Sequence, residues 1–280
     1  MHARRSLIFA AACLLASAAV APCGPRAEAG GGSPVSLVLQ PRAFSHNDEQ
    51  HARPLLDALS FGFCSVEADV YLVDGELAVA HDRGTVDPGR TLDSLYLRPL
   101  WERFQANGGH IYPEEAAFTL LIDVKNTGAE TFRAVDRELA AYDPMLTHFT
   151  DDSTTAGAVT VIISGDRATG VILGSNPRRA AIDGRLSDLD GPLNRNQMPL
   201  VSDDWTAHFR WRGPQEMPPE EAADLDTLVA RAHERGMRIR FWATPQTGAF
   251  WARLSDAGVD LLNADDLGGL SALLRQKRGN

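Results

Sequence analysis

Hydrophobic and polar residues alternate along this chain with two different periods. Short apolar runs rich in Val, Ile and Leu, such as 159–164, are typical of strands buried in a parallel sheet. Other stretches repeat apolar residues every three or four positions, as amphipathic helices do, and 219–235 is the clearest because acids open it and arginines close it. The pattern predicts strands within 35–45, 65–72, 77–80, 118–125, 159–164, 179–183, 199–202, 238–243 and 259–263, and helices at 54–60, 91–106, 129–142, 219–235, 246–257 and 267–277.

This succession of strands and helices predicts an α/β fold with a parallel sheet. Residues 35–280 contain no second linker and no internal repeat, so we interpret them as one domain. Their number matches a single (β/α)8 barrel, which has about 250 residues. The pattern leaves two forms of the sheet, a closed barrel and an open doubly wound sheet. No glycine-rich fingerprint follows the first predicted strand, which favours the barrel.

The first residues indicate export and not a part of the fold. Arg4 and Arg5 precede the apolar run 7–21, and small residues follow, as in a signal peptide and its cleavage region. The run is short for a membrane span. We therefore predict a signal peptide and processing region at 1–29, a flexible linker at 30–34, and a periplasmic or extracellular location.

Composition and cysteine positions bear on the expected partners, on lipidation and on disulfide bonds. The formal net charge is −10 and no basic run is present, which argues against a nucleic-acid partner. Cys13 leaves with the predicted signal peptide. Cys23 follows Pro22, an unfavourable residue before a lipidated cysteine, so a lipoprotein is disfavoured. Cys64 is expected to be a small buried residue without a disulfide, and we expect a monomer.

Candidate chemistry is concentrated where the first predicted strands end. In a (β/α)8 barrel these carboxyl ends line the active face, and residues two apart on a strand share one side. One histidine ends the first strand and another closes the predicted hairpin, while the second and third strands each carry a pair of polar residues. The residues are His46, Glu67, Asp69, His81, Asp123 and Lys125.

A divalent cation explains three carboxylates at one mouth, since they would otherwise repel one another and their pKa values would rise. Oxygen ligands favour Mg²⁺ or Ca²⁺, and no His-x-x-x-His or cysteine pair suggests zinc. Bound Mg²⁺ keeps positions open for substrate oxygens, those of phosphate above all. A salt-bridged core fits each residue alone, but it accounts less well for the whole set.

The segments HND, SVEADVYLVDGELAVAHD and LLIDVK resemble the PI-PLC-like phosphodiesterase superfamily. This superfamily includes the glycerophosphodiester phosphodiesterases and the spider-venom sphingomyelinase D enzymes. The resemblance is greatest to the branch named for altered inheritance of mitochondria. It extends over about 43–266 and is dense between His46 and Lys125, where the order His, Glu-x-Asp, His, Asp-x-Lys is specific.

The resemblance implies a single-domain TIM barrel with a bound divalent cation. It implies that His46 and His81 act as general acid and base and that Lys125 stabilises charge on the phosphate. Trp242 matches an aromatic residue that flanks the substrate, and Asn263 lies where the last strand meets the mouth. The implied metal ligands are Glu67, Asp69 and Asp123.

Two departures from the glycerophosphodiesterase pattern concern the substrate. Those enzymes usually have Arg and Gly after the first histidine, where this chain has Asn47 and Asp48. A phosphate-contacting arginine is therefore missing there, which argues against an ordinary glycerophosphodiester substrate, and we take Asn47 as a substrate-binding candidate. Asp123, where those enzymes commonly have Glu, agrees better with the sphingomyelinase D pattern.

Several other polar and aromatic residues have ordinary structural explanations. Asp265 and Asp266 follow the last strand, where Asp commonly caps a helix. Tryptophans 205, 211 and 251 are expected to pack in the interior. Head-group selectivity depends on the later loops, 169–215.

Together these features predict an exported, metal-dependent phosphoric diester hydrolase. Its expected substrate is a small-molecule or lipid phosphodiester: a glycerophosphodiester, a lysophospholipid or a related phospholipid head group, reached by brief contact with a membrane surface. One alternative is an exported binding protein on a phosphodiesterase-like barrel, which would not need two proton-transfer groups. Another is a metal-independent phosphoinositide-cleaving enzyme, which the three carboxylates disfavour.

Overall fold

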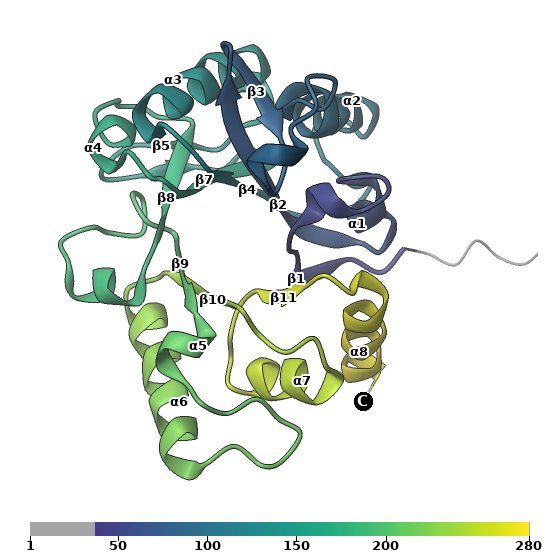
Figure 1. Cartoon of the computed structure of the whole chain (residues 1–280), viewed down its shortest axis with the longest axis vertical. Helices are drawn as coiled ribbons and strands as arrows, with labels where there is room; N and C mark the ends of the chain where they lie inside the picture. The colour runs from purple at the N-terminus through teal and green to yellow at the C-terminus, as the bar shows by residue number, and fades with distance from the viewer. Residues whose placement is uncertain (1–36, 280) are drawn as a thin grey trace, which may run out of the picture. The chain divides into compact units, whose positions relative to one another are not determined.

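Eight parallel strands form a nearly closed barrel in the computed structural model, which describes residues 37–279 (Figure 1). A single parallel bridge, between Arg240 and Leu261, connects the two ends of the ring. Around the ring the strands are β10 (Arg238–Trp242), β9 (Leu200–Asp204), β8 (Ala180–Gly184), β7 (Val159–Gly165), β4 (Phe118–Val124), β2 (Phe63–Val73), β1 (Gln40–Ser45) and β11 (Leu262–Ala264). The predicted barrel is confirmed, and the open doubly wound alternative is wrong.

The predicted signal peptide at 1–29 and linker at 30–34 lie outside the described residues, so these boundaries stay predictions. Within residues 37–279, no helix combines the length and the hydropathy that a membrane span requires.

Helices cover the outside of the ring (Figure 1). The amphipathic pattern explains their placement: in α3, for example, Phe132, Val135 and Leu139 are buried against the barrel while Arg133 and Arg137 face solvent. The helices are α1 (Leu56–Ser60), α2 (Arg98–Ala106), α3 (Gly128–Leu139), α4 (Thr169–Ile172), α5 (Trp205–His208), α6 (Pro219–Glu234), α7 (Gly248–Asp256) and α8 (Leu267–Gly279).

Short elements join these helices and strands, and the sequence pattern missed most of them. They have too few residues for a period to emerge. They are the 3-10 helices η1 (Asp48–Gln50), η2 (Arg83–Thr85), η4 (Ala140–Met145) and η5 (Leu186–Asp190), the π-helix η3 (Asp93–Leu97), and the strands β3 (Glu76–Val79), β5 (His148–Phe149) and β6 (Thr154–Thr155).

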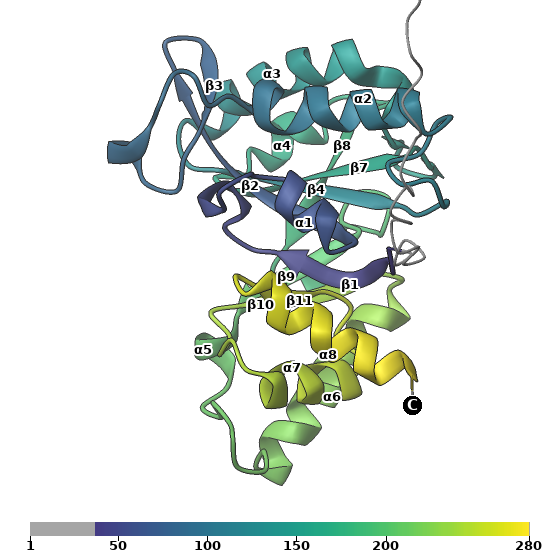
Figure 2. The same cartoon turned by 90° about the vertical axis from the view of Figure 1, so that its right-hand side faces the viewer.

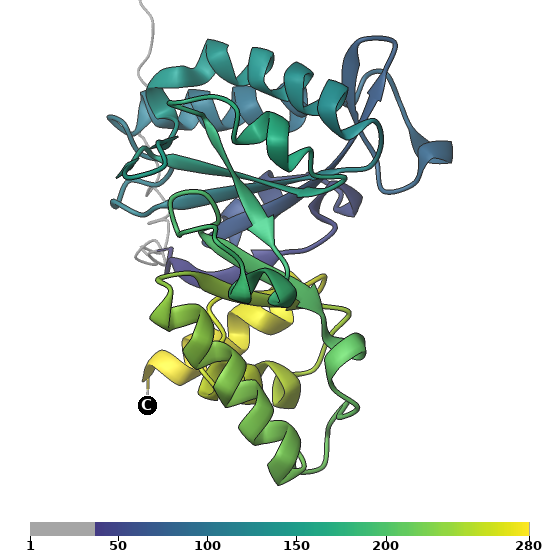
Figure 3. The same cartoon turned by 90° about the vertical axis from the view of Figure 1, so that its left-hand side faces the viewer.

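The β2–β3 hairpin extends past the barrel, as Figures 2 and 3 show from two sides. Its turn is Asp74–Gly75, as predicted, and both residues have positive φ angles, of 51° and 90°. The returning strand brings the chain back to the barrel mouth, where the Ala80 amide donates to the Asp69 carbonyl oxygen at 3.1 Å. The hairpin therefore places His81 beside Asp69.

Alternation along the strands sorts side chains between the barrel interior and the layer under the helices. Phe44 of β1 and Leu121 of β4 belong to a small apolar cluster, separate from the large core under the helices, that also contains Ile162, Leu200 and Leu261. His46 lies two residues beyond Phe44, and Asp123 lies two beyond Leu121. The same alternation therefore points these polar side chains into the mouth above this apolar layer.

The remaining core agrees with the sequence interpretation. Trp205 and Trp251 are buried, and Trp211 stacks on Phe250 with ring centroids 4.7 Å apart. Cys64 is buried and free, and burial raises the pKa of its thiol to about 11.

Candidate active site

One pocket of about 300 Å³ at the carboxyl ends of the strands collects nearly all the predicted site residues. Asn263 is the exception: it is 1% exposed in β11 and does not line the pocket. Four further lining residues, from β7, the β8–η5 connection and β10, were not predicted. The pocket is lined by His46, Asn47, Glu67, Asp69, His81, Asp123, Lys125, Ser164, Gly165, Arg185, Arg240 and Trp242.

His46 is held between two carboxylates. Its Nδ1 lies 2.7 Å from Oδ1 of Asp265, and its Nε2 lies 3.6 Å from Oε2 of Glu67. Asn47 donates its side-chain amide to the same Asp265 oxygen at 3.1 Å. Burial acts to raise the pKa of Asp265, but the hydrogen bonds from His46 and Asn47 outweigh it and the pKa is lowered. Asp265 thus orients His46, which the helix-cap interpretation missed.

His81 is oriented by a carboxylate in the same way. Its Nδ1 lies 2.8 Å from Oδ2 of Asp69, and its side chain is 45% exposed at the pocket wall. In the tautomer that donates its Nδ1 proton to Asp69, Nε2 of His81 is the nitrogen available for proton transfer. Both predicted proton-transfer groups therefore belong to His–carboxylate pairs.

Lys125 compensates the charge of two carboxylates. Its Nζ lies 2.9 Å from Oδ2 of Asp69, the oxygen that His81 also contacts, and it forms an ion pair with Asp123. Burial acts to lower the pKa of Lys125, but these carboxylates raise it above the ordinary value. Burial, and then the charge of Glu67, raise the pKa of Asp69 to about 6.

Arg240 does for Glu67 what Lys125 does for Asp123. Its Nη2 lies 3.5 Å from Oε1 of Glu67, and its guanidinium lies 3.9 Å from the centre of the Phe44 ring. Burial acts to raise the pKa of Glu67, but Arg240, followed by His46 and Lys125, lowers it. The Nε and Nη1 of Arg240 have no hydrogen-bond partner among residues 37–279. A basic residue two positions before Trp242 in a barrel strand was the signal that could have found it.

The predicted metal ligands Glu67, Asp69 and Asp123 line the same pocket, with Lys125 and Arg240 as their present partners. Carboxylates are the ligands that Mg²⁺ and Ca²⁺ prefer, but the oxygens of these three do not all lie within 4.8 Å of one another and would have to move closer to hold one ion. In the described part of the chain, one group of three acidic or histidine residues has ligand atoms within 4.8 Å of one another: Glu49, Asp69 and His81. Sequence reasoning missed Glu49, although it lies three residues after His46.

Asp48 has a structural role. It is fully buried and accepts hydrogen bonds from the Ser45 hydroxyl at 2.6 Å, the Leu55 amide at 2.5 Å and the Tyr96 hydroxyl at 3.0 Å. Burial raises its pKa. Asp48 therefore fixes η1 over the barrel mouth and leaves Asn47 to face the pocket.

The approach of β7 to Asp123 requires a glycine. Gly165 has a φ of +70°, and a Cβ there would contact the Val124 carbonyl oxygen and lie 2.5 Å from Oδ1 of Asp123. We expect Gly165→Ala to lower the free energy of unfolding by about 2–4 kcal/mol, measured by urea denaturation. Gly170→Ala in α4, where a Cβ would meet open space, is the matched control and should not destabilise the protein. Equal effects of the two changes would contradict this account.

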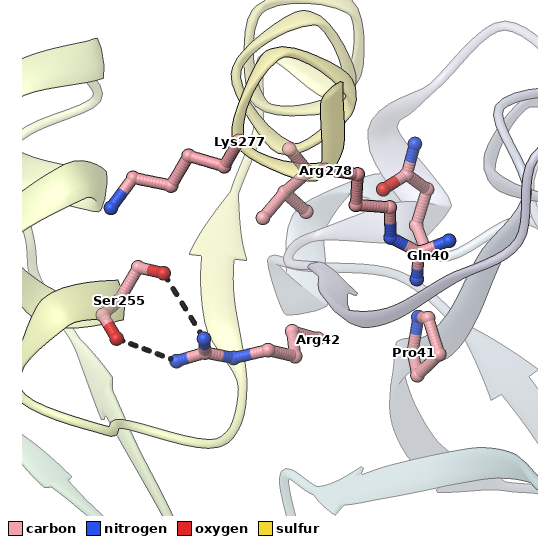
Figure 4. Close-up of a pocket in the computed structure, with 7 residues that line it drawn as sticks. Gln40, Pro41, Arg42, Ser255, Lys277 and Arg278 are labelled. Carbon is pink, nitrogen blue, oxygen red and sulfur yellow. Dashed lines mark hydrogen bonds between the residues drawn. The ribbon is translucent and has the colours of Figure 1, made fainter. Parts of the chain in front are cut away.

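A second hollow, of about 200 Å³, lies between the start of β1 and the end of α8 and holds none of the predicted residues (Figure 4). Its Arg42 donates to the Ser255 hydroxyl at 3.0 Å and carbonyl oxygen at 3.2 Å (Figure 4). Its Lys277 donates to Asp256 at 2.5 Å. Arg42 and Lys277 thus have partners within the fold, and Arg278, the third cation of this hollow, is exposed to solvent.

The chain is similar to known proteins in sequence and in fold. Residues 36–182 match the family described as AIM6-like phosphodiesterase domain. Altered inheritance of mitochondria protein 6 of Eremothecium gossypii is 30% identical over 272 residues, which cover 82% of this chain and 68% of that protein. The homologue of Arthroderma benhamiae is 28% identical over 259 residues, 80% of each chain.

Solved structures share the barrel. A glycerophosphodiester phosphodiesterase from Parabacteroides distasonis superposes with a TM-score of 0.53 at 14% identity, covering 85% of this chain and 98% of that one. Another from Agrobacterium tumefaciens gives 0.51 at 15% identity, covering 86% and 100%. At these identities the likeness establishes the fold, and the sequence matches establish the family. The chain belongs to the AIM6-like phosphodiesterase family.

Proposed function

We propose that this protein is an exported, metal-dependent phosphoric diester hydrolase that acts on a glycerophosphodiester, a lysophospholipid or a related phospholipid head group. The observation that carries the proposal is the pair of histidines in one pocket, each oriented by a carboxylate, with Lys125 between Asp69 and Asp123. The N-terminal pattern of arginines, apolar residues and small residues supports export.

Proton transfer by the two histidines would drive the reaction. One histidine removes the proton of the nucleophile, which is water or a neighbouring hydroxyl of the substrate, and the other protonates the leaving alkoxide. Asp265 and Asp69 stabilise the positive charge that forms on His46 and His81 in turn. Lys125 stabilises charge on the phosphate. Glu67, Asp69 and Asp123 would hold Mg²⁺ or Ca²⁺, which supplies a Lewis acid for the phosphoryl oxygens.

The side of the pocket formed by Arg185 and Trp242 would contact the parts of the substrate outside the reacting phosphate. Arg185 lies 4.8 Å over the ring of Trp242, so a charged and an aromatic surface meet at the mouth. Arg240 lines the pocket, but its unpartnered Nε and Nη1 atoms are buried. It would therefore act on a bound phosphate through its charge, in place of the arginine that this chain lacks beside His46. Asn47 would then orient His46 more than it binds substrate, because its amide is engaged by Asp265.

A panel of phosphodiesters tests this function. We expect the purified protein to hydrolyse at least one of glycerophosphocholine, lysophosphatidylcholine, sphingomyelin or phosphatidylinositol with Mg²⁺ or Ca²⁺, and to lose this activity in a chelator. Product release is measured by phosphorus NMR. If these compounds raise the melting temperature of the protein but none of them is hydrolysed, the protein is a binding protein and not an enzyme. Turnover undiminished in chelator would contradict the metal dependence.

A further inference from the structure

Glu49 is a buried acid that the proposed mechanism does not use. It is 4% exposed, and neither carboxylate oxygen has a hydrogen-bond partner among residues 37–279. Arg90 reaches this residue, but it donates to the main-chain oxygen, at 2.5 Å, and not to the carboxylate. An unpartnered buried carboxylate is costly, and burial followed by the charge of Asp69 raises the pKa of Glu49 to about 8. At neutral pH this acid is therefore protonated unless a cation compensates its charge.

The position of Glu49 supplies the geometry of a cation site. Its Oε1 lies 3.7 Å from Nδ1 of His81, which lies 2.8 Å from Oδ2 of Asp69. Two ligand atoms that each lie about 2.1 Å from one cation are about 3–3.5 Å apart at octahedral or tetrahedral angles. These two separations bracket this range, and the ligand atoms of Glu49 and Asp69 lie within 4.8 Å of each other. The three residues would have to move closer together to contact one ion.

The ion pairs around the site also favour a cation position beside Glu49. Glu67 is paired with Arg240, and Asp123 is paired with Lys125. Glu49 has only the imidazole of His81 within ion-pair distance in the described chain, and a neutral imidazole supplies no charge. A divalent cation would compensate Glu49 and its neighbour Asp69 together.

We propose that Glu49, Asp69 and His81 form a cation position of their own, beside the one expected at Glu67, Asp69 and Asp123, with Asp69 shared between them. This inference rests on the proposed function, because the second ion would share Asp69 with the first. Glu49 itself lines a neighbouring hollow, and His81 lines both. Two carboxylates and an imidazole suit Mn²⁺ or Zn²⁺ better than Mg²⁺. Two ions that share a carboxylate can hold the attacking and leaving oxygens of one phosphate.

The second position would also separate the roles of the two histidines. If Nδ1 of His81 ligated a cation, it would give up the proton that it otherwise donates to Asp69, and its Nε2–H would be a hydrogen-bond donor toward the pocket. His46, whose Nδ1 is engaged by Asp265, is then the group that accepts the proton of the nucleophile.

Equilibrium dialysis against Mn²⁺, with metal analysis of the full chain, tests the proposal. We expect about two ions per chain for the wild type and about one for both Glu49→Gln and Glu67→Gln. Asp82→Asn, which removes an exposed carboxylate next to His81, is the matched control and should retain about two. Glu49→Gln keeps the size of the side chain, and its melting temperature without metal should equal or exceed that of the wild type; Glu49→Ala is a second variant.

The possible results separate this inference from the proposed function. A wild type that binds a single ion overturns the second position, and so does a Glu49→Gln variant that still binds as many ions as the wild type. Neither result affects the proposed hydrolase if Glu67→Gln loses an ion and chelator abolishes turnover. A wild type that binds no Mn²⁺ overturns both.

Discussion

Replacement of His46 by alanine should lower turnover about 10²–10⁴-fold, because the variant loses one of two proton-transfer groups. The substrate is the phosphodiester that the wild type hydrolyses in the panel, and kcat is measured at saturating substrate and metal. Asp265 would lose its ring partner at 2.7 Å, but it is partly solvated and keeps its hydrogen bond from Asn47. The variant should therefore stay folded, with a melting temperature close to that of the wild type.

His148 provides the matched control for this experiment. Its Nε2 lies 3.0 Å from Oδ1 of Asp143, so it too is a histidine paired with a carboxylate, but it does not line the pocket. His148→Ala should leave kcat unchanged. If His46→Ala and His148→Ala turn over substrate equally well, His46 does not transfer protons in this reaction.

Replacement of Lys125 by methionine should have opposite effects on turnover and on metal binding. Turnover should fall about 10²–10³-fold, as when a charge-stabilising donor is removed from a transition state. Affinity for the divalent cation should rise, because the ammonium that Asp69 and Asp123 now share is gone and both carboxylates become free to ligate. Single-turnover kinetics and metal titration of the same preparation measure the two quantities.

A fall in turnover together with a rise in cation affinity would distinguish charge stabilisation by Lys125 from a purely structural role. A lysine that only maintained the fold would, when replaced, weaken turnover, metal binding and thermal stability together. Lys125→Arg, which retains the charge, should restore the wild-type metal affinity. Loss of cation binding in Lys125→Met would show that the lysine organises the carboxylates and does not compete for them.

The fold was predictable because its signals are local. A buried parallel strand such as 159–164 needs a continuous apolar run, and a covering helix such as 219–235 needs one apolar face; both are found where the sequence places them. The last strand is shorter than predicted, Leu262–Ala264 in place of 259–263. Its first residues precede the pairing with β1, which starts at Leu262, and only one bridge joins this segment to β10.

The contacts within the site were predictable from geometry only where one strand carries both residues. Glu67 with Asp69, and Asp123 with Lys125, are two apart, so strand geometry alone places them on one side. Asp265 lies 219 residues from its partner His46, and only the pairing of β1 with β11 brings them together. A sequence motif cannot indicate a contact that exists only because the first and the last strand of the barrel pair.

Asn47 and Asp48 illustrate the other limit. The sequence interpretation treated this dipeptide as a change in substrate recognition. In the structure, Asp48 bonds to Ser45, Leu55 and Tyr96 in the interior, and Asn47 supports His46 together with Asp265. The two residues differ in role because Asp48 is buried and Asn47 faces the pocket. Loop residues show no hydrophobic periodicity, so the sequence does not indicate which of two neighbours is buried.

One oxygen atom of Asp69 joins two parts of the site. Oδ2 contacts Nδ1 of His81 at 2.8 Å and Nζ of Lys125 at 2.9 Å. Each group is therefore part of the electrostatic environment of the other, and the free-energy costs of removing them are not independent. In a double-mutant cycle, the free-energy costs of replacing His81 and Lys125 would not add up to the cost of replacing both. Acid–base catalysis by His81 and charge stabilisation by Lys125 are therefore thermodynamically coupled through Asp69.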